Sequence, residues 1–493
     1  VNEITSGEGI TISDSAASGV KLVENLQLSS SLSITSDEVW SVGSITADAA
    51  ITFSNDKDLS VGSLSLTGNN TEMSLGASDI TVSVVDPVSV GETQIIRNGG
   101  GFFNFSGGLT LGDGSELIGQ GQKILGDITL NGGKLSVEEN TEFPGDISVS
   151  AGSAIHIVSS KTLTYGGKAV DIGASKLEIN GGGSFANTET TPIKLNDEDS
   201  GLVLDNVIVS NVSATEASSQ QGILETSNNS TVNNLSLTEK LRLSVDMDKT
   251  LTVTNPLVVP AEGIDLSGAG TLKLNDSLTL NGNASLASGG SLTVDAKGLL
   301  VNFGGDLNLN GGVLLTDNST NFHLLSNSTL TTNVEQVIGN VTIQQGQEPM
   351  LTLSTDTELK VIQPLILGVP CPYSLPVKPK AQLRMPGGVR IKTDGVLCID
   401  AWLEGDIVLD GGTLQIDGDT SISSASAISI ASASELKLIE GASLTYEGEA
   451  ISLDTNRLSV SGGGSLVLKT DGSNPLTLNN ADGDLEFSGN GAN

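Results

Sequence analysis

The chain has few side chains suited to acid–base chemistry. Its two histidines are His156 and His323. His156 stands between two isoleucines, at an outward position of an alternating strand pattern, so we interpret it as solvent-facing and structural. His323 has no acidic residue beside it in the sequence. Neither histidine therefore shows the partner that general acid–base catalysis requires.

Adjacent acidic residues are the other candidates for catalysis. Asp197-Glu198-Asp199 and Glu138-Glu139 are the clearest cases, and we interpret both as solvated corners. Enzymes that cleave polysaccharides need clustered carboxylates, basic residues and usually an aromatic platform for the sugar. Trp40 and Trp402 fall at unrelated phases of the repeat and do not form such a platform. We therefore predict that the protein is not an enzyme and has no catalytic residues.

Turns rich in Asp and Gly are the candidates for a metal site. Gly112-Asp113-Gly114 and Asp417-Gly418-Asp419 offer oxygen ligands that could hold Ca²⁺ weakly, although such sequences are more often plain turns. Tandem copies of the calcium-binding nonapeptide do not occur, and no Cys/His cluster favours zinc. No Gly-rich loop favours a nucleotide. We predict no metal and no cofactor, apart from weak binding of Ca²⁺.

Short strands of alternating hydrophobicity must position all of these residues. Ile128-Thr129-Leu130, Ile147-Ser148-Val149 and Ile428-Ser429-Ile430 each place two aliphatic side chains on one face and a small polar one on the other. Glycine-rich corners, where a positive φ costs little, separate such strands. With only 3% aromatic residues the interior must be narrow. We predict an all-β fold, a parallel right-handed β-solenoid of roughly twenty coils with about 20–25 residues each.

Charge and composition restrict the partners. The formal net charge of -35 excludes nucleic acid, which would repel this surface. No apolar run approaches the ~20 residues that a membrane-spanning helix needs, so we expect no membrane insertion by this chain. The chain begins at Val1 without a visible signal peptide, which we interpret as a removed leader or a processed fragment. We expect a secreted protein at the cell surface. Its Asn-x-Ser/Thr sequons, all between Asn69 and Asn340, permit glycosylation without demonstrating it.

A second, longer repeat spans most of the chain. Residues 61–91 align without a gap to 338–368, at an offset near 280 that persists further along. We therefore predict two homologous solenoid blocks, 1–211 and 279–493, joined by connecting coils at 212–278. The strongest matches pair Met73 with Met350, Pro87 with Pro364, Gly126-Asp127-Ile128 with Gly405-Asp406-Ile407, and Leu163-Thr164-Tyr165 with Leu444-Thr445-Tyr446.

One stretch, 363–390, interrupts the rhythm. It holds six of the 13 prolines, so we predict that it leaves the sheet as a loop insertion. Cys371 and Cys398 flank most of it and are candidates for a disulfide, which would contribute about 3 kcal/mol. The loop is either a tolerated insertion or a subunit contact that reaches an acidic neighbour. The basic residues of that putative contact are Lys378, Lys380, Arg384 and Arg390.

The runs GDITLNGGKLSV at 126–137 and GDIVLDGGTLQI at 405–416 resemble the passengers of bacterial autotransporter and haemagglutinin-type adhesins. The resemblance lies in the texture of the repeat over nearly the whole chain. It implies a pectin-lyase-like right-handed β-helix that is exported to the cell surface.

These observations favour a non-catalytic extracellular structural protein. We expect a rod-like subunit of a cell-surface fibre or filament that assembles head-to-tail with other copies of itself through uncapped solenoid ends. The alternative is a surface adhesin whose solenoid loops bind a host ligand or surface glycans. A more remote alternative is a β-helix enzyme that acts on polysaccharides.

Overall fold

A computed structural model gives the fold of the chain. It describes residues 40–303 apart from gaps at 54–56, 70, 76–79, 92–93, 216–221, 288–290 and 297–298, and residues 388–468 apart from 393–395, 400–401 and 454. Elsewhere it describes only separate strands, within 3–36, 307–384 and 484–488. Two compact units, Val1–Thr252 and Val253–Asn493, are described one after the other.

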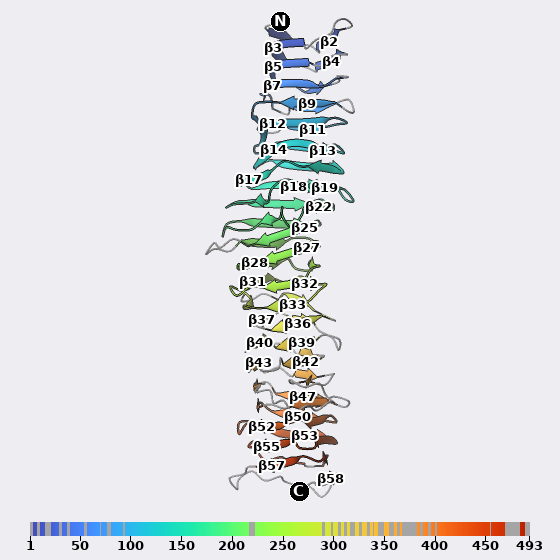
Figure 1. Cartoon of the computed structure of the whole chain (residues 1–493), viewed down its shortest axis with the longest axis vertical. Coiled ribbons are helices and arrows are strands. Elements are labelled where there is room, and N and C mark those ends of the chain that lie inside the picture. Colours follow the sequence, from blue (N-terminus) through green and yellow to red (C-terminus); the bar gives the residue numbers. More distant parts are fainter. Residues whose placement is uncertain are drawn as a thin grey trace. The chain divides into compact units, whose positions relative to one another are not determined.

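The first unit consists of parallel strands that stack coil upon coil (Figure 1). Ile45 pairs with Leu64, and Ile155 pairs with Ile179, so that partners are 19 and 24 residues apart. One ladder comprises β6 (Ile51–Phe53), β8 (Glu72–Leu75), β11 (Ile95–Asn98), β13 (Glu116–Gln120), β15 (Lys134–Glu139), β18 (Ser153–Ile157), β21 (Lys176–Asn180), β24 (Gly201–Asp205), β26 (Ile223–Thr226) and β28 (Leu241–Val245). The other strands are β1 (Glu3–Ser6), β2 (Ile10–Asp14), β3 (Lys21–Leu28), β4 (Leu32–Ser36), β5 (Trp40–Ala47), β7 (Leu59–Leu66), β9 (Thr81–Val84), β10 (Val88–Val90), β12 (Phe102–Leu111), β14 (Ile124–Asn131), β16 (Thr141–Phe143), β17 (Ile147–Ala151), β19 (Thr162–Tyr165), β20 (Val170–Asp171), β22 (Ser184–Ala186), β23 (Ile193–Lys194), β25 (Ile208–Ala214), β27 (Ser230–Leu237) and β29 (Thr250–Val253).

Columns of aliphatic side chains fill the interior of the first unit. Leu117, Leu135, Ile155, Ile179 and Leu204 pair in turn across five coils, and each is 0% exposed. Burying one such side chain contributes about 1.5–3 kcal/mol. Because side chains alternate along a strand, the intervening residues face outward. The alternation that the sequence shows therefore sets which residues stack.

An asparagine ladder is also buried in the first unit. The Asn187 amide donates to the carbonyl oxygen of Asn211 at 2.8 Å, and the Asn211 amide donates to the carbonyl oxygen of Asn187 at 2.6 Å. Asn234 extends the ladder by donating to Asn211 Oδ1 at 2.9 Å. Both Asn187 and Asn211 are buried, at 7% and 8% exposed. Asn211 is also the first residue of a sequon, but its side-chain amide is buried and hydrogen-bonded within the fold.

The second unit repeats this architecture. Leu397, Leu414, Leu436 and Val460 form a buried column across four coils. One ladder comprises β31 (Ile264–Gly268), β34 (Ala284–Leu286), β37 (Leu307–Leu309), β40 (Ser328–Thr332), β43 (Met350–Leu353), β46 (Gln382–Arg384), β49 (Trp402–Glu404), β52 (Asp419–Ile422), β55 (Ser443–Tyr446) and β57 (Ser465–Leu468). The other strands are β30 (Leu257–Val259), β32 (Thr271–Leu274), β33 (Leu278–Leu280), β35 (Thr293–Asp295), β36 (Leu300–Phe303), β38 (Val313–Leu315), β39 (Asn321–Leu324), β41 (Gln336–Ile338), β42 (Asn340–Ile343), β44 (Leu359–Val361), β45 (Leu365–Ile366), β47 (Val389–Lys392), β48 (Val396–Ile399), β50 (Ile407–Asp410), β51 (Thr413–Ile416), β53 (Ile428–Ser432), β54 (Ser434–Leu438), β56 (Arg457–Gly462) and β58 (Asp484–Ser488).

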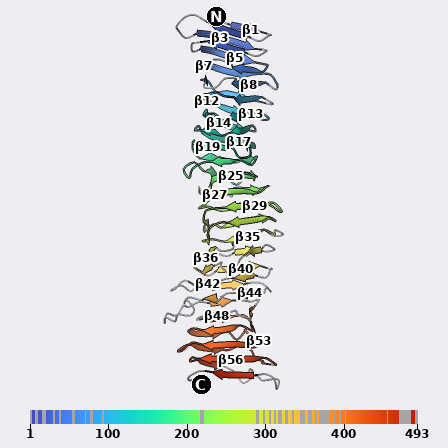
Figure 2. The same ribbon diagram turned by 90° about the vertical axis from the view of Figure 1, so that its right-hand side faces the viewer.

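The predicted all-β, parallel β-solenoid is confirmed (Figures 1 and 2). About 14 turns are counted, against the roughly twenty coils expected for the whole chain. Much of 304–387 lies outside the described residues, and coils there are represented only by separate strands. The described part of the chain contains no helix long and apolar enough to cross a membrane.

The predicted loop at 363–390 is too long. Strands β45 and β46 fall inside it and β47 begins inside it, and Leu365 pairs with Leu397 while Arg384 pairs with Thr352. Prolines exclude a ladder donor only at their own positions, so the strands between them remain in the sheets. Residues 367–381 lie outside the described part of the chain.

Candidate functional site

Only some of the residues predicted for the contact and the disulfide lie in the described part of the chain. Lys378, Lys380 and Cys371 lie outside the described residues. Arg384 ends β46, and Cys398 lies in β48, where it pairs with Ile366. Both the disulfide and the contact loop therefore stay predictions.

Arg390, the last residue of the predicted contact, lies in β47 beside an acidic side chain of the second unit itself. Its guanidinium group is 3.4 Å from Asp410 Oδ2 on β50, the neighbouring coil. This ion pair is part-exposed, so its contribution to stability is about 1 kcal/mol or less. Arg390 thus already has an intramolecular role, which any contact with a second molecule would have to share.

His156 faces outward, as predicted. In β18 it stands between buried Ile155 and Ile157, and its Nδ1 lies 2.5 Å from Oδ1 of Asn180 one coil further on. His323 lies in β39 between Asn302 and Thr342 of the neighbouring coils, where only the backbone is described. Each histidine is thus a strand residue in register with uncharged neighbours.

The acidic pairs behave differently from one another. Asp197-Glu198-Asp199 forms a turn in which the Asp199 N–H donates to Asp197 Oδ1 at 3.0 Å, as expected for a corner. Glu138-Glu139 is not a solvated corner, because both residues lie in β15. The prediction was wrong there because neighbouring coils supply their partners: Lys161 Nζ lies 2.6 Å from Glu139 Oε2.

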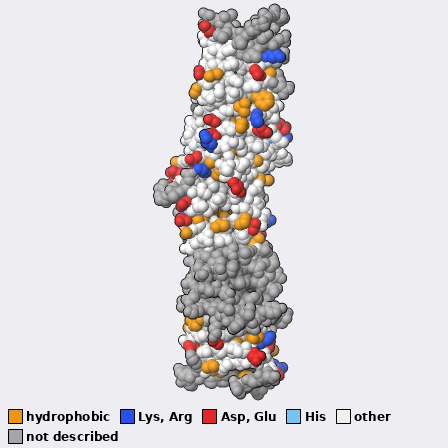
Figure 3. Space-filling model, viewed as in Figure 1, with side chains coloured by type: hydrophobic (Ala, Val, Ile, Leu, Met, Phe, Trp, Pro, Cys, Tyr) orange, Lys and Arg blue, Asp and Glu red, His pale blue; other side chains and the backbone are white. Residues whose placement is uncertain are grey.

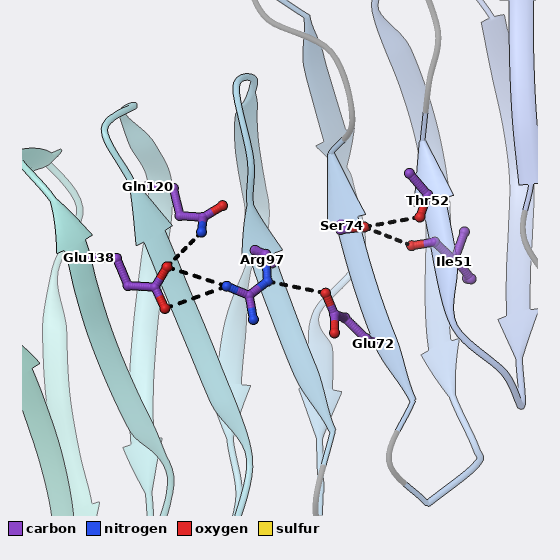
Figure 4. A network of polar contacts seen from close by, with 7 residues as sticks. All are labelled: Ile51, Thr52, Glu72, Ser74, Arg97, Gln120 and Glu138. Carbon is purple, nitrogen blue, oxygen red and sulfur yellow. Dashed lines mark hydrogen bonds and ion pairs between the residues drawn. The ribbon is translucent and has the colours of Figure 1, made fainter.

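Glu138 belongs to a network that crosses several coils of the first unit (Figure 4). Arg97 on β11 lies 3.1 Å from Glu72 Oε1 and 3.4 Å from Glu138 Oε2. The Gln120 amide donates to the same Glu138 oxygen at 2.6 Å. Arg97 therefore joins two carboxylates from different coils, and the charge of neither is left without a partner.

A second charged cluster of the same ladder surrounds Glu116. Lys134 Nζ lies 3.0 Å from Glu116 Oε1, and the Ser136 hydroxyl donates to the same oxygen. Burial alone would raise the pKa of Glu116, but the hydrogen bonds from Ser136 and Lys134 outweigh it and lower the pKa. The carboxylate therefore stays charged and clamps two coils.

The structure describes the aspartates of both candidate calcium turns. Asp113 lies in a turn, where Gly114 has a φ of 70°. Asp417 accepts a hydrogen bond from the Gln415 amide at 2.9 Å, and burial raises its pKa. Asp419 accepts from the Ser443 hydroxyl at 2.7 Å. Among the described residues no three His, Cys, Asp or Glu side chains gather to hold a metal ion.

A buried tyrosine closes one coil corner in the first unit. The Tyr165 hydroxyl donates to the Lys168 carbonyl oxygen at 2.5 Å and accepts from the Ile147 N–H, one coil earlier, at 3.2 Å. Burial raises its pKa to about 12. A Cβ at Gly167 would lie 2.7 Å from the hydroxyl, so the corner leaves room only for glycine there.

The same corner occurs in the second unit. The Tyr446 hydroxyl donates to the Glu449 carbonyl oxygen at 2.7 Å and accepts from the Ile428 N–H at 3.2 Å. A Cβ at Gly448 would again lie 2.7 Å from the hydroxyl. Burial raises the pKa of Tyr446 as well. Two segments about 280 residues apart thus share hydrogen bonds, close contacts and electrostatics.

No family model matches the chain, and neither a curated protein nor a solved structure matches it.

Charged side chains of both signs lie on the surface of the first unit. Acidic and basic side chains are scattered over the visible face of the first unit (Figure 3). Several of them pair across coils, such as Lys168 Nζ with Asp146 Oδ2 at 2.6 Å and Lys123 Nζ with Glu142 Oε2 at 2.8 Å. The sequence analysis missed these pairs, the Asn187–Asn211 ladder and the tyrosine corners, although partners one coil apart in sequence were the available signal.

Proposed function

We propose that the protein is a non-catalytic, extracellular structural component of a cell-surface fibre or filament. In this proposal a solenoid block has been repeated to add length, with blocks 1–211 and 279–493 joined by the coils at 212–278. The observation that carries it is the recurrence of the Tyr165 corner at Tyr446 with the same hydrogen bonds.

Further coil-to-coil contacts recur between the two blocks. The Asp146 N–H donates to Asp127 Oδ1, and the Ala427 N–H donates to Asp406 Oδ1, both at 2.9 Å. A hydrogen bond to a serine recurs as well. Ser153 Oγ accepts from the Gly132 N–H at 2.9 Å, and Ser434 Oγ accepts from the Gly411 N–H at 3.0 Å. Such contacts hold one coil to the next. Their repetition supports a structural role, in which the protein serves to build a long stack of coils.

Outward side chains differ between the blocks at equivalent positions. His156 is matched by Lys437, and the Lys168–Asp146 ion pair is matched by Glu449 and Ala427, which cannot form it. A duplicated catalytic site would be expected to repeat its outward chemistry as well as its buried scaffold. The differences between the outward side chains of the two blocks therefore favour a structural role over a catalytic one.

The contacts between coils within one chain indicate how separate copies of the chain would join. Inside the chain, parallel backbone ladders and aliphatic columns hold one coil to the next. A solenoid coil that stacks on a coil of another molecule would use the same contacts, giving head-to-tail homopolymers. Export by the route of autotransporter or haemagglutinin-type adhesins is part of the proposal, and it follows from the texture of the repeat.

Electron microscopy and analytical ultracentrifugation of the purified chain test the proposal. We expect filaments or a series of end-to-end oligomers whose population rises with concentration. A monodisperse monomer at all concentrations would overturn the filament proposal.

A charge-reversal variant tests the contact loop separately. Changing Lys378, Lys380 and Arg384 to Glu should weaken assembly if these residues meet an acidic neighbour. The control carries the same change in net charge at Lys176→Glu, Lys249→Glu and Lys273→Glu. Equal assembly of the two triple variants would remove the loop from the interface while leaving the structural role open to the first experiment.

A further inference from the structure

An outward groove crosses four neighbouring coils of the first unit. Its volume is about 400 Å³, within the range of small-molecule sites. It is lined by residues of β12, β16 and β19 and of the turn before β14, among them Phe102, Gln122, Lys123, Asn140, Glu142 and Thr164.

Four of these residues form one column, with one residue from each coil. Glu142 pairs directly with Thr164, and Lys123 Nζ reaches Glu142 Oε2 at 2.8 Å. Phe102 and Lys123 immediately precede Phe103 and Ile124, which pair with each other. Since parallel strands are spaced by about 4.8 Å, the column extends over roughly 14 Å, long enough for two or three linked sugar rings.

The groove combines one aromatic ring with several polar side chains. Phe102 is part-exposed, whereas Phe103, Phe105, Phe143 and Phe185 are 0% exposed. A part-exposed ring offers an apolar face against which the C–H face of a sugar can stack. Amide, ammonium, carboxylate and hydroxyl groups beside it supply donors and acceptors for neighbouring sugar hydroxyls.

Two features of these polar side chains favour a neutral ligand that binds to groups already held in place. The Lys123–Glu142 ion pair cancels its own charge, and the chain as a whole carries -35, which disfavours an acidic polysaccharide. Asn140 is held in place because its Oδ1 accepts the Thr162 N–H at 3.0 Å. A fixed side chain loses less entropy when it binds a ligand.

The second unit has a corresponding column. Gln382, Trp402, Ser421 and Thr445 pair in turn from coil to coil. Trp402 stands three residues before Gly405-Asp406-Ile407, as Lys123 stands three before Gly126-Asp127-Ile128. Its side chain is part-exposed. Phe102 and Trp402 thus each supply one part-exposed aromatic ring, and exposed or part-exposed hydroxyl groups of neighbouring coils lie in the same column, Thr164 in the first unit and Ser421 and Thr445 in the second.

We propose that these two columns bind neutral oligosaccharides along the coils. In the first unit Phe102 stacks against one sugar ring while Glu142, Lys123 and Asn140 hydrogen-bond the hydroxyls of the rings beside it. In the second unit Trp402 provides the stacking face. This binding activity is independent of self-assembly and would add ligand recognition to a structural protein.

Calorimetric titration of the full chain with cellotriose, maltotriose and tri-N-acetylchitotriose tests the proposal, with trigalacturonate as the charged control. We expect at least one neutral trisaccharide to bind and trigalacturonate to bind more weakly. Phe102→Ala should weaken binding at the first site about tenfold, which corresponds to a loss of about 1.4 kcal/mol of stacking free energy. Trp402→Ala should abolish the ligand-induced change in tryptophan fluorescence.

Controls separate a lost site from a lost fold. Ile208→Ala removes an exposed aliphatic side chain of the first unit outside the groove and should bind as the unaltered chain does. Glu142→Gln keeps the shape of the groove and should also weaken binding. The proposal is overturned if no neutral trisaccharide binds, or if the double variant Phe102→Ala/Trp402→Ala binds as tightly as the unaltered chain. Neither result depends on whether filaments form.

Discussion

The Tyr165 hydroxyl donates a 2.5 Å hydrogen bond to the backbone carbonyl oxygen of Lys168, three residues further along the chain. The hydroxyl oxygen of Tyr165 in turn accepts a hydrogen bond from the Ile147 N–H of the preceding coil. One phenol therefore shapes its own corner and ties it to the preceding coil. Its ring stacks on Phe143, with centroids 6.1 Å apart, and is tilted against Phe185, with centroids 5.6 Å apart.

Removing this hydroxyl should destabilise the first unit. Tyr165→Phe leaves the Ile147 N–H and the Lys168 carbonyl oxygen without their partner, at a cost of about 1–3 kcal/mol in the free energy of unfolding. Tyr446→Phe should cost a similar amount in the second unit. Urea unfolding followed by circular dichroism measures both. The control Glu189→Ala, on an exposed turn, should change stability by no more than about 0.5 kcal/mol, and a Tyr165→Phe value this small would contradict the role of the corner.

Stability should also fall at alkaline pH. Burial raises the pKa of Tyr165 to about 12, whereas the phenol of a tyrosine in the unfolded chain has a pKa of about 10. The folded state therefore binds its proton more tightly, so the contribution to stability is complete below about pH 10 and is lost as the pH rises towards 12. Thermal unfolding between pH 9 and 12 should show this loss, and it should be smaller in Tyr165→Phe/Tyr446→Phe. Phenolate absorbance that appears near pH 10 from these two tyrosines would refute the expectation.

The asparagine ladder should be sensitive to a single substitution. Asn211→Ala removes the amide that donates to Asn187 and the oxygen that accepts from Asn234, and it leaves buried polar groups unpaired. Each such group costs about 1–3 kcal/mol, so the variant should unfold at clearly lower urea concentration. Asn69→Ala, at an exposed position, is the matched control and should be nearly neutral. Equal midpoints for the two variants would show that the ladder adds no stability.

Glycine is required at one corner and not at another. Gly126 has a φ of 95°, and a Cβ there would lie 2.1 Å from the Phe105 carbonyl oxygen. Gly126→Ala should therefore destabilise the first unit by about 1–3 kcal/mol through backbone strain and steric overlap. A Cβ at Gly152 meets nothing within 4 Å, so Gly152→Ala should be neutral or stabilise by about 0.4–1 kcal/mol. Melting temperatures of the two variants provide the measurement, and a stable Gly126→Ala variant would contradict the steric argument.

The inward and outward positions could be predicted because they depend on local alternation. Ile155 and Ile157 are 0% exposed, and His156 between them faces outward, as the pattern indicates. The extent of the loop at 363–390 was overestimated for an equally local reason. Proline marks where a ladder donor is missing, but it does not mark how soon the chain returns to a sheet, and β46 shows that it returns by Gln382.

Contacts between coils could not be predicted from local pattern. Glu138-Glu139 looked like a solvated corner because Arg97 and Lys161, their partners, are 41 and 22 residues away. The column of Phe102, Lys123, Glu142 and Thr164 was hidden in the same way, since no two of its members are close in sequence. Each depends on which residue of one coil lies beside which residue of the next.

The sequence by itself therefore determined the solenoid and its aliphatic interior. Strand side chains alternate with a period of two, so a short segment is sufficient to show which face is buried. Only the tertiary structure decided the partners, because the spacing between paired residues in the first unit varies from 18 for Leu117 and Leu135 to 25 for Ile179 and Leu204. The conformations of the corners set these lengths, and a shift of one residue would exchange inward for outward side chains.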